Sequence, residues 1–235
     1  SIGVIYLAVH RMAATLERER SGGMLAAAGA IQDTIDRCLF ERYGDVQAFG
    51  LNTEVHVDLT AIDEAKRGAI TTVIDNYVKA YGCYIYSFVT DPTGRIVAIN
   101  SVDANGRPLP AAARLTGTSV ADTAWFRDVV AGKFTTGKAP DGSDLLSGTV
   151  VTDPAPDTLA DSLYGKAAPV WTMTFSAPIR NAAGKLIGYW HNAFSPAMLE
   201  QILVSNYDAL VTQGLATAEL NIPERQSACT SSRRE

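Results

Sequence analysis

The pattern of apolar positions in residues 1–50 predicts one long helix. Apolar side chains return at helical spacing and form a single stripe made of Ile31, Ile35, Leu39, Val46 and Phe49. A continuous helix over this range would be about 75 Å long at about 1.5 Å per residue. That length exceeds a compact domain of this size, so we expect a stalk. Ser21-Gly22-Gly23 is the place where a kink is expected.

Residues 83–100 have the pattern of a β-hairpin. Large apolar and small side chains alternate along 83–90, which would place Tyr84, Tyr86 and Phe88 on one face of the strand. Asp91-Pro92-Thr93-Gly94 fits a type I turn, and 95–100 returns as the second strand. We therefore expect an antiparallel strand pair here.

A second hairpin is predicted for residues 171–194. Trp171 to Ala177 alternates in the same way, Asn181 and Gly184 suit the ends of a type I turn, and 186–194 is apolar and aromatic. Because successive side chains of a strand point to opposite faces, His191 and Asn192 should lie on opposite sides of the sheet.

Helices are predicted between and after these hairpins. One begins near Thr60, with capping-box spacing to Asp63, and ends at Tyr81-Gly82. Another begins at Thr118 or Ser119 and stops at Gly132. Residues 133–147 and 153–166 are expected to be loops, and 148–152 a short strand.

The last predicted helix has Ser195 as its N-cap and Pro196 as its first residue, and it ends at Gly214. Hairpins joined in sequence, with helices between them, predict an α+β domain built on a central antiparallel sheet. The expected division is a stalk or dimerisation helix (1–59), a ligand-binding domain (60–200), a signalling helix with the possible start of a second module (201–222), and a disordered tail (223–235).

Composition narrows the function classes. The net charge of −5 and the absence of a basic run argue against a nucleic-acid partner. The cysteines and histidines have no metal-ligand spacing, and no nucleophile, phosphate-loop or dinucleotide motif is present, so we expect no metal, no cofactor and no enzyme activity. Cys38 and Cys83 could form a disulfide in an oxidising compartment, but two separate buried thiols are the simpler interpretation.

The apolar run 2–9 has two interpretations. It is too short to span a bilayer by itself, and it could be the end of a transmembrane helix or the apolar start of a water-exposed helix.

Four segments, in this order and spacing, resemble the Cache family of PAS-like sensor domains. They are Arg42 to Phe49, Tyr84 to Val97, Asp122 to Phe126, and Phe175 to Gly188. The resemblance covers residues 30–213. It implies a PAS-like α+β fold with a long N-terminal helix, a central antiparallel sheet and flanking helices.

The resemblance also implies a function. Such domains are periplasmic, extracytoplasmic parts of inner-membrane chemoreceptors; they bind a small molecule and transmit the event by displacing the terminal helix. It implies a homodimer formed through the N-terminal helix and membrane attachment through transmembrane segments outside this sequence. The alternatives are the sensor domain of a histidine kinase or diguanylate cyclase, or a protein-interaction and dimerisation module without a ligand.

Comparison with the amino-acid-binding members of that family suggests which residues bind the ligand. Their pocket-helix motif Arg-x-Trp-Tyr corresponds to Thr123-Ala124-Trp125-Phe126, their Tyr-x-Asp to Val151-Thr152-Asp153, and their last-strand Asp to Asn192. Without the arginine, a bidentate carboxylate clamp is lost. An amine, a heterocycle or another small organic molecule is therefore the implied ligand.

The candidate ligand-binding residues are Tyr86, Trp125, Phe126, Asp153, Trp171 and Asn192. Each has a structural alternative. Aromatic side chains are more often core than ligand contacts, an Asp before Pro154 is common in turns, and a buried amide can be satisfied by the backbone.

Overall fold

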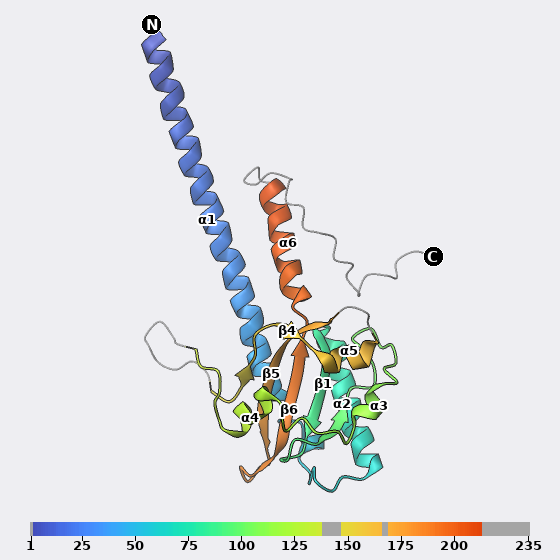
Figure 1. Ribbon diagram of the computed structural model, residues 1–235. Coiled ribbons are helices and arrows are strands. Elements are labelled where there is room, and N and C mark those ends of the chain that lie inside the picture. The colour runs from blue at the N-terminus through green and yellow to red at the C-terminus, as the bar shows by residue number, and fades with distance from the viewer. Residues whose placement is uncertain (1, 138–146, 166–168, 213–235) are drawn as a thin grey trace, which may run out of the picture. The chain divides into compact units, whose positions relative to one another are not determined.

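The computed structural model describes residues 2–137, 147–165 and 169–212 (Figure 1). The chain divides into two compact units, one of Leu39–Pro196 and one of Ser1–Cys38 with Ala197–Glu235. Each unit is described by itself, and the sheet belongs to the first.

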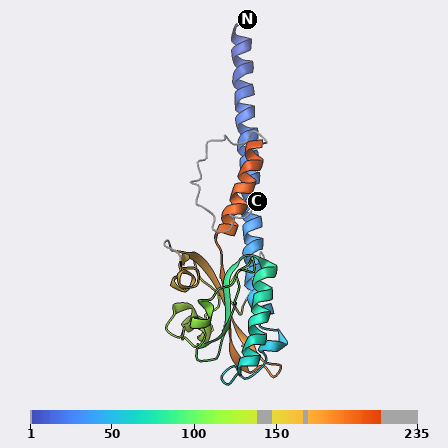
Figure 2. The same ribbon diagram turned by 90° about the vertical axis from the view of Figure 1, so that its right-hand side faces the viewer.

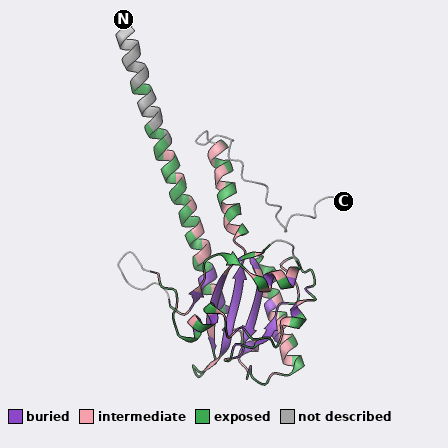
Figure 3. Ribbon diagram, viewed as in Figure 1, coloured by how far each residue is buried: buried purple, intermediate pink, exposed green. Residues whose placement is uncertain are grey.

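An antiparallel sheet forms the centre of the unit Leu39–Pro196, as the α+β pattern predicts. Its order is β2-β1-β6-β5-β3, and β4 pairs with β5 outside this path. The strands are β1 (Tyr84–Thr90), β2 (Ile96–Ile99), β3 (Val150–Val151), β4 (Ala155–Pro156), β5 (Trp171–Arg180) and β6 (Leu186–Phe194). Most residues of β1, β2, β5 and β6 are buried (Figure 3).

Helices cover both faces of the sheet (Figure 2). The end of α1 (Ile2–Phe49) and all of α2 (Glu64–Tyr81) cover one face, named here the α2 face. The short helices α3 (Ala112–Leu115), α4 (Ala124–Val130) and α5 (Thr158–Tyr164) lie on the other, named the α4 face. A 3₁₀ turn, η1 (Thr53–Val55), connects α1 towards α2.

Aromatic rings fill the α2 face. Phe49 stacks on Tyr77 with ring centroids 4.1 Å apart, and Trp190 lies 5.6 Å from Phe49. The Trp190 Nε1–H donates to Ser87 Oγ at 2.8 Å and to Asn192 Oδ1 at 2.9 Å. The buried side chains of Ser87, Trp190 and Asn192 therefore join β1 to β6 on this face. A buried indole N–H usually has a hydrogen-bond partner, and here it has two.

A β-bulge changes the predicted facing of β1. The pairing of β1 with β6 shifts register between Tyr84 and Tyr86. Tyr84 consequently contacts Phe49 on the α2 face, whereas Tyr86 stacks against Phe88 and His191 on the α4 face. The prediction that all three aromatic residues of β1 share one face is wrong for Tyr84, because a bulge inserts a residue without changing the sequence alternation.

Two helix starts differ from the prediction. Helix α2 begins at Glu64 because Asp63 is its N-cap and accepts from Lys66 N at 2.7 Å. Helix α4 begins after Thr123 because the segment predicted to start it pairs with the β1–β2 turn and the start of β2 instead. Val120 N donates to Gly94 O at 2.8 Å, and Ile96 N donates to Thr118 O at 2.9 Å.

Several other predictions can be compared directly with the structure. Helix α1 is continuous through Ser21-Gly22-Gly23, with no break, and the turns at Gly94 and Gly184 form as expected. The loop predicted for 153–166 contains β4 and α5. Cys38 and Cys83 are both thiols.

In the second unit, α6 (Ala197–Thr212) forms the predicted terminal helix, whereas Gly214 and the predicted tail fall outside the described residues. Within the part of the chain that the structure describes, no helix combines the length and the apolarity required to cross a membrane.

Gly188 of β6 provides a test of the packing on this sheet. A Cβ at this buried position would meet Thr90 O and would lie 2.6 Å from Leu59 Cδ1. Gly188→Ala should lower the free energy of unfolding by about 1–3 kcal/mol, as overpacking does. Gly68→Ala, at an exposed helical glycine with open space around it, should instead raise it by up to about 1 kcal/mol. Urea unfolding measures both, and equal effects would contradict this account of β6.

Candidate functional site

An aromatic cluster covers the α4 face of the sheet. It is named here the α4-face cluster and consists of Tyr86, Phe88, Trp125, Phe126, Tyr189 and His191. Strands β1 and β6 supply four of these residues, and α4 supplies the other two. Because side chains alternate along β6, Tyr189 and His191 lie on this face and Trp190 and Asn192 lie on the other. The prediction that His191 and Asn192 lie on opposite faces is confirmed.

Helix α4 holds the indole of Trp125 over the sheet. Its ring lies 4.1 Å from the ring of His191 and 6.0 Å from that of Phe88. The neighbouring Phe126 is buried and packs so closely on the turn at Gly94 that an added Cβ there would lie 2.9 Å from its Cζ. Phe126 thus anchors α4, while the half-buried Trp125 forms the outer layer of the cluster.

His191 is a neutral histidine inside this cluster. Its Nδ1 lies 2.8 Å from the Oγ of buried Ser176. Burial lowers the pKa of His191 from 6.5 to about 3, and the nearby charge of Asp157 opposes the change only in part. The ring therefore offers an uncharged, polar surface under Trp125 near neutral pH.

Asp157 connects α5 to the sheet. Its Oδ1 accepts from Leu159 N and Ala160 N as the N-cap of α5. Its Oδ2 accepts from Tyr86 Oη at 2.7 Å and Thr172 Oγ1 at 2.8 Å. Burial, and then this carboxylate, raise the pKa of Tyr86 well above its ordinary value, so the phenol stays protonated.

Hydroxyl groups of β5 line the same face beside the rings. Thr172, Thr174 and Ser176 alternate along β5 towards the α4 face, and all three are buried. Thr174 Oγ1 lies 2.8 Å from Thr152 Oγ1. The cluster is thus bordered by a row of hydroxyls, which can donate or accept hydrogen bonds without carrying charge.

The structure brings together three of the six predicted site residues. Tyr86, Trp125 and Phe126 lie in the α4-face cluster. Asp153 is exposed beyond the end of β3, and Trp171 is 50% exposed at the first residue of β5.

Asn192 lies on the α2 face, away from that cluster. Its Oδ1 is held by Ser87 Oγ at 2.6 Å and by Trp190 Nε1. Among the described residues its Nδ2 has no partner. The position of Asn192 along the last strand suggested that it binds the ligand. Because its side chain points to the α2 face, Asn192 instead belongs to the core that joins β6 to β1.

His191 and Asp157 are the site residues that the sequence analysis did not select. The alternation of β6 was sufficient to place His191 on the face opposite Asn192. Asp157 is followed by Thr158-Leu159-Ala160, the pattern of an N-cap before a short helix, inside a segment expected to be loop.

The chemistry of the cluster suits binding. Rings supply stacking surfaces, and the hydroxyl row supplies neutral hydrogen bonds. Among the described residues, neither Lys nor Arg hydrogen-bonds to a member of the cluster. No three His, Cys, Asp or Glu side chains within the described ranges gather as a metal ion would require.

Comparison with known proteins relates this fold to sensor domains. No family model matches the chain, and no curated protein matches it. The sensor domain of the V. cholerae histidine kinase DctB is similar to 77% of this chain and 58% of its own, with 11% identity and a TM-score of 0.52.

Chemoreceptor domains are similar to the same extent. The ligand-binding domain of Campylobacter jejuni Tlp3, in complex with L-valine, matches 75% of this chain and 60% of its own, with 12% identity and a TM-score of 0.50. That of the Pseudomonas aeruginosa PAO1 amino acid chemoreceptor PctC, in complex with GABA, matches 75% and 64%, with 19% identity and a TM-score of 0.48.

This chain therefore spans about 60% of the length of these structures. It has the Cache-type sensor-domain fold, as the resemblance predicted.

Asp157 should be a structural residue of the site. Asp157→Ala removes the cap of α5 and leaves two hydroxyls, one of them the fully buried phenol of Tyr86, without an acceptor. Cap loss costs about 1 kcal/mol and each unsatisfied buried group about 1–3 kcal/mol, so we expect a loss of about 3 kcal/mol or more in urea unfolding. Asp157→Asn keeps a capping oxygen and should lose less; an equal loss in both variants would contradict the capping role.

The low pKa of His191 predicts acid sensitivity. Since its folded-state pKa is below its ordinary value of 6.5, its contribution to stability is complete above pH 6.5 and is lost as the pH falls from there towards about 3. The expected slope is up to about 1.4 kcal/mol per pH unit. His191→Gln should flatten this part of the stability profile.

A second measurement separates this effect from the titration of carboxyl groups. The ring proton shifts of His191 in NMR should stay constant through the pH range in which a free histidine peptide titrates. A His191 titration near 6.5 would contradict the assignment of a neutral buried ring.

Proposed function

We propose that this chain is an extracytoplasmic sensor domain of a transmembrane chemoreceptor that binds a small molecule on the α4 face. The observation that carries the proposal is the close, tilted contact of Trp125 with His191, at 4.1 Å between ring centroids, above the aromatic sheet face and bordered by buried hydroxyls. The fold that the chain shares with the DctB and Tlp3 domains supports it. These similar structures are sensor domains rather than enzymes.

The contacts at the start of α4 favour a ligand without a clamped carboxylate. Thr123 stands where the amino-acid-binding motif has arginine, and its hydroxyl is used locally. It donates to Val120 O at 2.8 Å and accepts from Phe126 N at 3.4 Å. A neutral His191 adds no positive charge. An amine, a heterocycle or a comparable small organic molecule matches this surface better than an anion does.

Trp125 is the residue that such a ligand would displace or stack upon. It is the half-buried outer ring of the cluster, whereas Phe126, Phe88 and His191 are buried below or beside it. A flat or cationic ligand gains from an indole face, by about 0.5–2 kcal/mol for a cation. Asp153, which is exposed at the end of β3, would contribute only if the ligand carries a cation.

The connection from the site to α6 is short. His191 lies in β6, and Ser195, just after β6, donates its N–H to Cys83 O at 3.0 Å. Helix α6 begins at Ala197. We propose that rearrangement under Trp125 shifts β6 against β1 and so displaces α6.

Two further elements of the proposal concern assembly and output. Helix α1 exposes large apolar side chains, Met24 at 51%, Leu25 at 77% and Phe40 at 54%, which would be covered if two copies pair through α1. The fold similarity to DctB supports the sensor domain of a histidine kinase as the alternative output for the same ligand-binding role.

Thermal unfolding of the chain with small amines, purines and organic acids tests the binding role. Compounds of the first two classes should raise the melting temperature and organic acids should not, because the site lacks a carboxylate clamp. Trp125→Ala should abolish the shift. Trp171→Phe, which changes an exposed indole outside the cluster, should leave it unchanged.

The same assay defines the role of Asp153. If the stabilising compound is a cation that Asp153 binds, Asp153→Asn should remove the shift in melting temperature. An unchanged shift would exclude that role for Asp153. Stabilisation that is equal in wild type and Trp125→Ala would contradict a site on the α4 face.

A further inference from the structure

A hollow lies at the end of the sheet formed by the turns β1–β2 and β5–β6. It has a volume of about 410 Å³ and is named here the end pocket. This volume is within the range of small-molecule sites, about 300–1,000 Å³. Its lining comes from the segment before α2, from Pro92, and from both sides of the β5–β6 turn: His56, Val57, Asp58, Leu59, Thr60, Pro92, Asn181, Lys185, Leu186 and Ile187.

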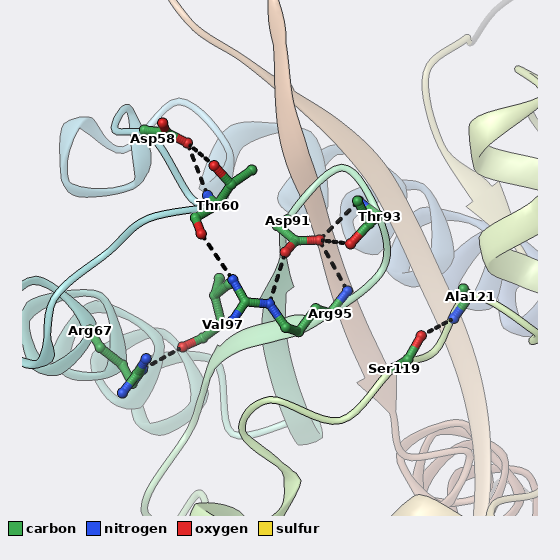
Figure 4. Close-up of polar contacts among 9 residues, drawn as sticks. All are labelled: Asp58, Thr60, Arg67, Asp91, Thr93, Arg95, Val97, Ser119 and Ala121. Carbon is green, nitrogen blue, oxygen red and sulfur yellow. Dashed lines mark hydrogen bonds and ion pairs between the residues drawn. The ribbon is translucent and has the colours of Figure 1, made fainter.

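Hydrogen bonds hold one wall of the end pocket in place (Figure 4). Asp58 Oδ1 accepts from Thr60 N at 3.0 Å and Thr60 Oγ1 at 2.6 Å. Thr60 O accepts from Arg95 Nη2 at 3.1 Å, and Arg95 Nε is paired with Asp91 Oδ2 at 3.0 Å. The loop that carries Asp58 is thereby attached to the β1–β2 turn, which preorganises this wall.

The β5–β6 turn, which forms another part of the lining, is also held by hydrogen bonds. Asn181 Oδ1 accepts from Ala183 N and Lys185 N, both at 3.0 Å, and these bonds stabilise the β5–β6 turn. Leu59 is 1% exposed and packs where Gly188 has no side chain. Together with Leu186 and Ile187 it gives the pocket an apolar portion.

The two walls contribute opposite charges. Asp58 is the acidic residue of the lining and Lys185 the basic one. The Thr60 hydroxyl and N–H lower the pKa of Asp58, and the charge of Lys185 lowers it further, so the carboxylate is ionised at neutral pH. Among the described residues, Asp58 Oδ2 and the Lys185 ammonium have no hydrogen-bond or ion-pair partner.

We propose that the end pocket binds a small zwitterion with a short apolar segment. Its ammonium group pairs with Asp58, its carboxylate pairs with Lys185, and its methylene groups lie on Leu186 and Ile187. Charged hydrogen bonds of this kind are roughly twice as strong as neutral ones, and the prebuilt walls reduce the ordering cost of binding. No lining residue belongs to the α4-face cluster, so this site is separate from the proposed sensory site.

Three probes of equal chain length test the charge pattern. They are 5-aminopentanoate, which carries both charges, pentylamine, which carries the cation, and pentanoate, which carries the anion. Methyl NMR of the full chain locates binding through the signals of Val57, Leu59, Leu186 and Ile187. We expect saturable shifts of these methyl groups with 5-aminopentanoate and an affinity at least tenfold weaker for each single-charge probe.

Variants that remove one charge each test whether Asp58 and Lys185 bind the probe. Asp58→Asn keeps the oxygen that Thr60 uses, and Lys185→Met keeps the length of the side chain; each should weaken 5-aminopentanoate at least tenfold. Lys79→Met, an exposed charge on α2 outside the lining, should have no effect.

The proposal fails if none of the probes shifts these methyl groups, or if pentanoate or pentylamine binds as well as the zwitterion. It also fails if Asp58→Asn and Lys185→Met bind like wild type. Binding that is lost in Trp125→Ala but kept in those two variants would assign the probe to the α4 face and overturn the end pocket, without affecting the proposed sensory function.

Discussion

Strand β6 is the constraint on which the rest of the structure depends. It lies between β1 and β5, and its alternating side chains build the layers on both faces. Trp190 and Asn192 fix the α2 face through hydrogen bonds to Ser87, whereas His191 supports the rings of the α4 face. One register of β6 therefore determines both the core and the candidate site, and a slip by one residue would exchange them.

The regular parts of this arrangement could be predicted from the sequence, because they follow from alternation and turn chemistry. The two hairpins, the terminal helix and the opposite facing of His191 and Asn192 are of this kind. The bulge after Tyr84 was hidden, since an inserted residue leaves the local pattern unchanged. The start of α4 was misplaced because Val120 pairs its backbone with Gly94, far away in the sequence, and this contact keeps residues 118–120 out of the helix. The N-cap that the structure uses is Thr123.

The candidate site was harder to predict than the fold, and Asn192 and Asp157 show why. Sequence position associates Asn192 with the family's last-strand acid, but only the register of β6 determines which layer it enters. Asp157 joins Tyr86 and Thr172, two residues far from it in the sequence, and that convergence exists only in three dimensions. A resemblance thus transfers a fold more safely than it transfers individual contacts.

The α4-face cluster and the end pocket differ in the charge of the groups that they offer to a ligand. This difference argues for separate roles. On the α4 face, burial keeps His191 neutral and Tyr86 protonated, and the carboxylate of Asp157 already accepts four hydrogen bonds within the fold. An arriving ligand there must be recognised by rings and neutral hydroxyls. In the end pocket, Asp58 and Lys185 are both exposed, and Asp58 is ionised. Because β6 runs from Leu186, at the end pocket, through His191 to the residue before Ser195, a ligand at either place would act on the same strand that leads into α6.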